Sequence, residues 1–270
     1  MATGRWSTIV LAAVLLLALG LQLGLFVSRQ SQTWDEGDHL YAGYRSLTHA
    51  DFGLNPEHPP LAKMLAAVPL LGMDLRVPPL QGRDFKREAF LGGRDFVFGN
   101  DADTVLFRAR MGASLLTLLL GLVAFLMAGE MFGAAAGLTA LALLVFDPNL
   151  LAHGALVTTD AGLSCFLLAS VYAFYRYVKA PSWPRLLVVG LAAGLALATK
   201  HTGLLVLPIL GLLALGEWWR GRGEEGETLR TRGLRLGGAV ALAGLLAVVV
   251  LWASYGFRYA ARPDGLALNP

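Results

Sequence analysis

Residues 9–27, IVLAAVLLLALGLQLGLFV, carry no charge and are followed directly by the polar sequence SRQSQTWDEGDHL. About 20 apolar residues let a helix cross a bilayer. The apolar run is longer than the core of a typical signal peptide, and the polar residues after it are a poor cleavage site. We therefore expect an uncleaved first transmembrane helix, with a group of acidic residues just beyond its end.

The composition of the whole chain agrees with a membrane protein. Hydrophobic residues make up 56% of the 270 residues and charged residues 15%, whereas about a quarter of a soluble domain is charged. The net charge of +3 does not indicate nucleic-acid binding, because the basic residues lie mostly between apolar windows. Cys165 is the single cysteine, which excludes an intrachain disulfide and a CxxC metal site.

Seven apolar windows predict an all-α polytopic membrane protein, built as a single transmembrane domain over residues 1–270 with a long first outer loop. Two of the windows are short, so they could be two short spans or one broken helix. The predicted spans are residues 7–27, 105–128, 132–151, 155–178, 185–199, 203–219 and 236–255, and the outer loop is residues 28–104.

Basic residues in the short connections predict the orientation, because such residues stay in the cytoplasm. One connection is flanked by Arg176, Lys179 and Arg185, and five arginines crowd residues 220–235. If both face the cytoplasm, residues 28–104 lie on the outer face, which would be the periplasmic face of a bacterial inner membrane or its equivalent. Residues 37–50 and 61–71 then read as interfacial helices, and residues 76–100 as a polar loop.

The outer loop begins with an acidic motif, Trp34-Asp35-Glu36-Gly37-Asp38-His39. A carboxylate here could act as a general base. The carboxylates and His39 could instead hold a divalent cation, with Asp38 and His39 as ligands, although the spacing matches no dedicated metal site. A third interpretation is structural, since acidic residues at a helix start favour the positive end of its dipole.

Two further groups carry positive charge. His58 and Lys63 flank a proline pair and could meet an anionic head group, or could form a turn with a snorkelling lysine. Arg108 and Arg110 begin the second span and could clamp a phosphate, or could anchor the helix at the interface.

The last candidates are Asp160, which opens an apolar window, and Lys200 with His201, which separate two windows. Asp160 could be a helix cap, and Lys200 could pair with it or with a phosphate. Ionisable groups at membrane depth are candidates for function. All of the candidates fall on the same predicted side of the membrane, where carboxylates and cations together would suit transfer from a phosphate-linked donor.

The order of these motifs resembles glycosyltransferase family 39, the protein O-mannosyltransferase and aminoarabinose-transferase group, which has the GT-C fold. Asp35-Glu36 matches the acidic pair of its first outer loop. The run His58-Pro59-Pro60-Leu61-Ala62-Lys63 is similar to the family's His-Pro-Pro-Leu-Gly-Lys, with alanine for glycine. Phe146-Asp147-Pro148-Asn149 resembles its Phe-Asp-Asn turn, with a proline inserted.

The resemblance implies a polyprenyl-phosphate-linked sugar as donor and an inverting transfer on the outer face. Asp35 would then be the catalytic carboxylate, with Glu36 beside it, and Asp160 would orient site residues. Lys63, Arg110 and Lys200 would be candidates for the lipid phosphate, with His58, Arg108 and His201 as further substrate-binding residues. The acceptor could be a protein, a lipid or a glycan, and no cofactor is implied beyond the divalent cation considered above.

Family members are longer than this chain, so the resemblance covers about their N-terminal half. The chain could be truncated, split, or a minimal homologue, with a partner chain supplying a C-terminal half. Two other functions stay open: a transporter or flippase of a lipid-linked anion, and a non-catalytic membrane subunit. The carboxylate separates them, because lipid movement should tolerate Asp35→Asn and sugar transfer should not.

Overall fold

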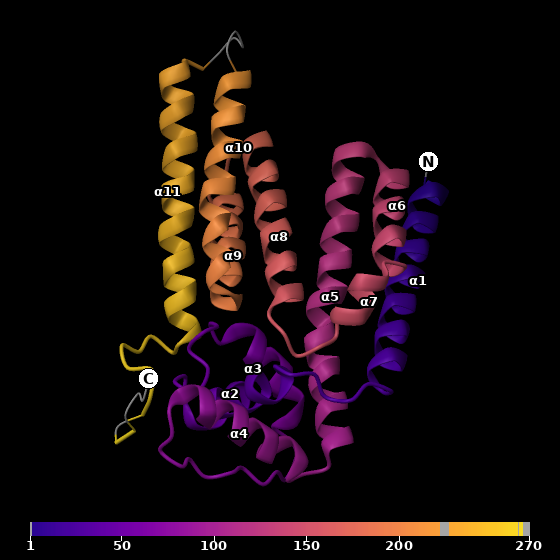
Figure 1. Cartoon of the computed structure of the whole chain (residues 1–270). Coiled ribbons are helices and arrows are strands. Elements are labelled where there is room, and N and C mark those ends of the chain that lie inside the picture. Colours follow the sequence, from indigo (N-terminus) through magenta and orange to yellow (C-terminus); the bar gives the residue numbers. More distant parts are fainter. Residues whose placement is uncertain (1, 222–226, 264, 267–270) are drawn as a thin grey trace.

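The structure is a bundle of long helices with a group of short helices at one end (Figure 1). This computed structural model describes residues 2–221, 227–263 and 265–266, and these contain no β-strand. The bundle helices are α1 (Ala2–Val27), α5 (Ala102–Phe132), α6 (Ala134–Val145), α7 (Pro148–His153), α8 (Asp160–Lys179), α9 (Trp183–Thr199), α10 (Val206–Arg220) and α11 (Leu229–Ser254). The short helices are α2 (Glu36–His49), α3 (Leu61–Ala67), η1 (Val68–Leu70) and α4 (Phe85–Phe98). The expectation of an all-α polytopic protein is confirmed.

Among the described residues, five helical segments are long and apolar enough to cross a membrane. They are Arg5–Val27, Ala102–Phe132, Asp160–Lys179, His201–Arg220 and Leu229–Ser254. The fourth joins a short 3-10 helix, η2 (His201–Leu205), to α10. The window at 185–199 forms the 17-residue α9, so these two neighbouring windows are separate helices with a break between them.

The predicted span 132–151 is divided in the structure. Gly133 adopts φ of 97°, which ends α5 and lets α6 turn back beside it. α6 has 12 residues, or about 18 Å of helix, short of the about 30 Å hydrocarbon core. Asp147 then caps α7 by accepting the N–H of Leu150, with Pro148 at the first helical position. The segment 154–159 is irregular, so α8 begins only at Asp160.

The charged connections and the short helices lie at opposite ends of the bundle. The N-terminus, the end of α10 and the start of α11 lie at the top of Figure 1, and α2 to α4 lie at the bottom. Arg176 and Arg185 belong to the α8–α9 connection at the upper end. This separation is what the charge pattern predicts. That the short helices face the outside remains a prediction.

We call residues 28–101, which include α2, α3, η1 and α4, the cap subdomain. It has its own core, which includes Leu40, Tyr41, Phe96 and Val97 packed against Val105 of α5. The expectation that residues 76–100 form a loop is wrong, because α4 occupies 85–98.

The sequence pattern did not predict α4, because Gly92 and Gly93 weaken a helical pattern. In the structure they permit close packing. A Cβ at Gly93 would overlap the backbone of Gly37 in α2, and a Cβ at Gly92 would strike the ring of Tyr41. Asp84 starts the helix by accepting the N–H of Arg87.

The segment after α11 returns to the cap subdomain. Arg262 places two nitrogens on the buried carboxylate of Asp51, at 3.0 and 3.1 Å, and Arg45 donates to the same group at 3.3 Å. The backbone N–H of Phe52 donates to the carbonyl of Ala261 at 2.7 Å. These contacts tie the segment after α11 to the turn after α2 and so help to hold the cap subdomain against the last bundle helix.

Candidate active site

Glu36 is the first residue of α2 and is fully buried. Its Oε1 accepts from Nε of Arg110 at 2.8 Å, and its Oε2 from Nη2 at 2.6 Å. The same carboxylate accepts the N–H of Thr33 at 2.9 Å and that of Val157 at 3.1 Å. Burial alone raises the pKa of Glu36, but the hydrogen bonds and charge of Arg110 and the two backbone N–H groups outweigh it and lower that pKa.

Arg110 has no donor left for a ligand. Besides the two bonds to Glu36, its guanidinium donates to the carbonyl oxygens of Val27, Gln30 and Ser31 at 2.8–3.1 Å. A guanidinium carries five N–H groups, and all five are used. The expected assignment of Arg110 to a lipid phosphate therefore has no support in this geometry. Arg110 instead joins the end of α1 to the start of α2, and Glu36 extends that junction to the segment before α8.

Asp35 lies at the same helix start but has a different environment. It occupies the N-cap position of α2, yet its side chain makes no capping hydrogen bond, with φ of −88° and ψ of −12°. The side chain is exposed, and no described residue donates a hydrogen bond to it. The structural interpretation is confirmed as to position, because Asp35 and Glu36 lie at the start of α2, where the helix dipole favours negative charge, although the Asp35 side chain forms no capping hydrogen bond. The motif separates into a free carboxylate, Asp35, and a locked one, Glu36.

Asp38 and His39 face the interior of the cap subdomain. His39 is buried, and its Nδ1 donates to the carbonyl of Val157 at 2.9 Å; burial lowers the pKa of this imidazole. One oxygen of Asp38 accepts from Asn55 at 3.1 Å, and the other is buried and has no hydrogen-bond partner among the described residues. Burial raises the pKa of Asp38 to about 6. Among the described residues, no group of three or more His, Cys, Asp or Glu side chains is placed to hold a metal ion.

Lys63 is buried beneath the proline turn, and its ammonium donates its hydrogen bonds to residues of that turn. Its Nζ donates to the backbone and side-chain oxygens of Asn55, at 2.6 and 3.2 Å, and to the carbonyl of His58 at 2.7 Å. Burial lowers the pKa of Lys63 to about 7. These contacts shape residues 55–63 into a compact turn, so Lys63 is placed as a structural residue rather than as a phosphate ligand.

The same turn positions the imidazole ring of His58. Its ring packs edge-on against that of His39, with centroids 5.2 Å apart. Burial, with the positive charges of His39, Lys63 and Lys200, lowers the pKa of His58 to about 4. His58 is therefore neutral near pH 7, and it can accept a hydrogen bond from a substrate but cannot act as a cation.

Asp160, Lys200 and His201 come together with the cap subdomain. Nζ of Lys200 lies 2.6 Å from an oxygen of Asp160, and this pair is solvent-accessible, with the aspartate side chain 68% exposed. Nε2 of His201 lies 3.2 Å from the carbonyl of Pro56. Burial lowers the pKa of His39, and the negative charges of Asp35 and Asp160 oppose part of that lowering.

Arg108 lies apart from this group. It is exposed on α5 and lines a cavity of about 360 Å³ together with Ser28 and Arg110. The two arginines therefore border the same cavity, but the five N–H groups of Arg110 are already donated to Glu36 and to backbone carbonyls. Arg108 is thus the arginine of the pair whose donors are available in this cavity.

A cavity of about 590 Å³ runs from Asp160 into the bundle. Its walls come from α5, α6, α7 and α8, where Leu120, Leu144 and Leu150 supply apolar surface. Asp147 and His153 are its other ionisable residues. An apolar groove with charged groups at one end fits an amphipathic ligand whose polar head lies near Asp160 and Lys200.

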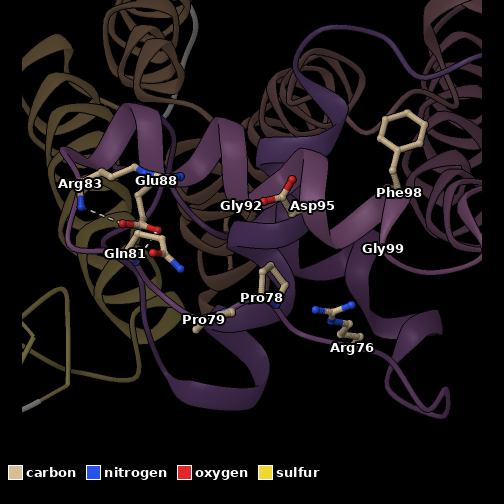
Figure 2. A pocket seen from close by; sticks show the side chains of 10 residues that line it. All are labelled: Arg76, Pro78, Pro79, Gln81, Arg83, Glu88, Gly92, Asp95, Phe98 and Gly99. Carbon is tan, nitrogen blue, oxygen red and sulfur yellow. Dashed lines mark hydrogen bonds between the residues drawn. The ribbon is translucent and has the colours of Figure 1, made fainter.

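A different cavity, of about 510 Å³, lies between α4 and the segment before it (Figure 2). Glu88 points toward Gln81 and Arg83 there and accepts both of their backbone N–H groups at 2.9 Å. The carboxylate is thereby used to close the loop onto α4. This cavity contains none of the residues predicted to act on substrate.

Sequence reasoning missed Asn55 and Val157. Asn55 joins Asp38 to Lys63, and it directly precedes Pro56 in the proline-rich segment that leads to His58, so its position there was a usable signal. Val157 acts through its backbone, donating to Glu36 and accepting from His39. Hydrogen bonds made by the backbone do not depend on the type of side chain, so the sequence carried no signal for the role of Val157.

Comparison with known proteins places this arrangement in context. The model of the family described as dolichyl-phosphate-mannose-protein mannosyltransferase matches residues 97–252. Among solved structures, the fold is similar to a chain of the Saccharomyces cerevisiae protein O-mannosyltransferase Pmt1-Pmt2 complex bound to the sugar donor, with a TM-score of 0.72 and 20% identity. The match covers 96% of this chain and 35% of that chain, so the present chain spans about a third of its length.

Proposed function

Because this chain belongs to the dolichyl-phosphate-mannose-protein mannosyltransferase family, we propose that it is a membrane glycosyltransferase that takes its sugar from a polyprenyl-phosphate donor. It is an integral, multi-pass membrane protein with a GT-C-type fold. The observation that carries the proposal is the contrast between Asp35 and Glu36. One carboxylate is bound by Arg110, and the other is exposed and accepts no hydrogen bond from a described residue.

In the proposed reaction Asp35 is the general base. A hydroxyl of the acceptor attacks the anomeric carbon of the donor sugar from the face opposite the phosphate. Its proton passes to the Asp35 carboxylate, the bond between the anomeric carbon and the phosphate oxygen breaks, and the polyprenyl phosphate leaves with the electron pair. The configuration at the anomeric carbon inverts. A base that is exposed and uncommitted, as Asp35 is, can reach such a hydroxyl.

Lys200 is the residue best placed to meet the leaving phosphate. Its partner Asp160 is largely exposed, so the ammonium can exchange that carboxylate for a phosphate oxygen at little cost. The apolar groove beginning at Asp160 would hold the first part of the lipid chain. Lys63 and Arg110 contribute indirectly, because their hydrogen bonds shape the surfaces that carry His58 and Asp35. The acceptor side of the site is on the predicted outer face.

The test is donor cleavage by the purified chain in lipid nanodiscs, with water or an added acceptor taking the sugar. Wild-type protein should release polyprenyl phosphate from a radiolabelled polyprenyl-phosphate hexose. Asp35→Asn should lower the rate by about 10²- to 10⁴-fold, the usual contribution of a general base. Asp103→Asn is the matched control, because Asp103 is also an exposed carboxylate in the first turn of a helix, and it should leave the rate unchanged.

The other outcomes separate the competing functions. Equal donor cleavage by wild type and Asp35→Asn would contradict the base assignment. No cleavage by either protein, with an intact fold, would favour a non-catalytic subunit. Movement of the lipid across the bilayer that survives Asp35→Asn, without cleavage, would favour a flippase. Anomeric configuration of the product, read by nuclear magnetic resonance, tests inversion independently of the rate.

A further inference from the structure

The cavity of about 510 Å³ between α4 and residues 76–83 is an elongated groove, and Arg83 and Arg76 lie toward its opposite ends (Figure 2). On the side of α4 its lining runs from Glu88 to Gly99, which corresponds to about 16 Å at about 1.5 Å of helix per residue. An extended chain advances about 3.3 Å per residue, so the groove has the length of about five residues of extended polypeptide. Its shape therefore suits a linear ligand rather than a single phosphate or sugar ring.

The wall opposite α4 is an extended segment with unused backbone groups. Val77 and Pro78 each precede a proline, which restricts both residues to extended backbone. The hydroxyl of Tyr41 donates to the carbonyl of Pro78 at 3.0 Å and fixes the segment to α2. The backbone N–H and C=O groups of Val77 and Leu80, by contrast, form no hydrogen bond with a described residue. Such groups can pair with the backbone of another extended chain.

This wall favours a polypeptide among linear ligands. An extended polypeptide presents N–H donors and C=O acceptors along its whole length, so it can complement both kinds of group in the wall. The backbone of a phosphodiester chain offers acceptors alone, and the carbonyls of the wall would stay without donors.

The charges that the groove leaves open are positive. Arg76 and Arg83 are exposed, and neither side chain has a partner among the described residues. The two carboxylates of the wall are already bound, because the buried Glu88 accepts two backbone N–H groups and Asp95 accepts from Arg94 at 2.7 and 2.9 Å. A guanidinium matches a carboxylate in fork geometry, so acidic side chains fit the two ends of the groove.

Phe98 connects the groove with the segment that carries Asp35. It is 63% exposed and lines both the groove and a cavity of about 280 Å³ whose wall includes Trp34. Trp34 is 77% exposed and directly precedes Asp35 in the chain. A linear ligand that leaves the groove over Phe98 therefore passes toward the proposed base.

We propose that the groove between α4 and residues 76–83 docks an extended, acidic segment of a polypeptide acceptor, whose serine or threonine hydroxyl is presented to Asp35. The inference rests on the proposed function, because it supplies the acceptor for the proposed base. Carboxylates of the acceptor pair with Arg76 and Arg83, and its backbone pairs with the unused N–H and C=O groups of the wall. The chain then prefers acceptor sites that have acidic residues to one side of the hydroxyl.

Peptide binding to the full chain in lipid nanodiscs tests the inference without turnover. The probe is a fluorescent peptide with one threonine and two glutamates about four residues apart, which matches the groove at about 3.3 Å per residue. Analogues replace the glutamates by glutamine or by lysine, and fluorescence anisotropy gives each dissociation constant. We expect the glutamate peptide to bind about tenfold more tightly than the glutamine analogue, with the lysine analogue weakest and the preference reduced at high salt.

Matched variants make the result specific. The double variant Arg76→Gln/Arg83→Gln should bind the glutamate peptide no more tightly than the glutamine analogue. Arg87→Gln is the control, because Arg87 is an exposed arginine of α4 that does not line the groove, and it should change nothing. A glutamate peptide that is N-methylated along its backbone keeps its charges but loses its N–H donors, so it should bind about tenfold more weakly. Thermal unfolding of each variant shows that the fold is retained.

Four results would overturn the inference. Equal binding of the glutamate and lysine peptides would remove the acidic preference, and equal losses in Arg87→Gln and the double variant would reduce it to general surface charge. Undiminished binding of the N-methylated peptide would exclude backbone pairing. Binding of a sulfated heparin fragment that requires Arg76 and Arg83, without binding of the glutamate peptide, would assign the groove to an acidic glycan. Failure of the proposed function would appear separately, as absent donor cleavage by the wild type with peptide binding intact.

Discussion

Replacing Glu36 by glutamine separates a structural role from a catalytic one at the acidic motif. In the wild type, Glu36 supplies the negative charge for Arg110 and accepts four hydrogen bonds in a fully buried position. Glutamine has nearly the same shape but no charge, and one of its two polar ends is a donor. The Nε2 group of the amide would then face Arg110 together with the backbone N–H of either Thr33 or Val157, and all of these groups are donors.

The size of the effect follows from burial. Arg110 is 1% exposed, so loss of the carboxylate leaves an uncompensated charge in the interior. Breaking a buried pair from one side typically costs about 3–5 kcal/mol. The three backbone carbonyls that Arg110 keeps place the expected loss near the lower end, about 3 kcal/mol. For a chain of this size that corresponds to a fall in Tm of about 6–12 °C.

The assay is thermal unfolding of the purified chain in nanodiscs, followed by intrinsic fluorescence. Glu57→Gln is the control in the same subdomain, because the Glu57–Lys86 pair is exposed and such pairs contribute about 0–1 kcal/mol. In the double variant Glu36→Gln/Arg110→Met the loss should be smaller than the sum of the two single losses. A Tm for Glu36→Gln equal to that of wild type, with donor cleavage abolished, would refute the structural role and make Glu36 catalytic.

Three other predictions test separate parts of the structure. Gly93→Ala should lower the free energy of unfolding by about 1–3 kcal/mol, because its Cβ would overlap the backbone of α2, whereas Gly72→Ala, which has open space around it, should change little; equal Tm values would contradict the packing. Lys63 has its pKa lowered from 10.5 to about 7, so between these values the unfolded chain binds a proton that the folded chain lacks. Stability should therefore rise with pH across that window, and Lys63→Met, measured by unfolding at several pH values, should flatten the slope. Lys200→Met should raise KM for the donor while Arg108→Met does not, and the reverse order in a steady-state cleavage assay would move the phosphate to the other cavity.

Much of the architecture was predictable because it depends on local composition. Apart from the window at 132–151, the apolar windows correspond to helices in the structure, since each window depends only on consecutive apolar residues. The amphipathic pattern at 37–50 matches α2, and the proline pair before residue 61 precedes α3. The distribution of arginines predicted which connections share an end of the bundle (Figure 1).

The helix boundaries that the sequence predicted wrongly have a different cause. α4 was missed because Gly92 and Gly93 disfavour a helix locally, and only its packing against α2 explains why glycine is needed there. The window at 132–151 read as one span because hydropathy does not register the left-handed backbone at Gly133 or the cap at Asp147. Both features interrupt the helix within a continuous apolar stretch of sequence.

The membrane-spanning character of this chain and the place of its acidic motif beside a helix end could be read from the amino-acid sequence, because apolar length and charge placement are local properties. The role of each charged side chain depends on partners that are distant in the sequence and are brought close by folding. Glu36 meets Arg110 74 positions away and Val157 121 positions away, so those two partners close the shell around one carboxylate and leave its neighbour Asp35 open. Lys63 and Arg110 look like phosphate ligands in sequence, yet their donors are used internally. Burial and long-range hydrogen bonding, which no local pattern encodes, set that division.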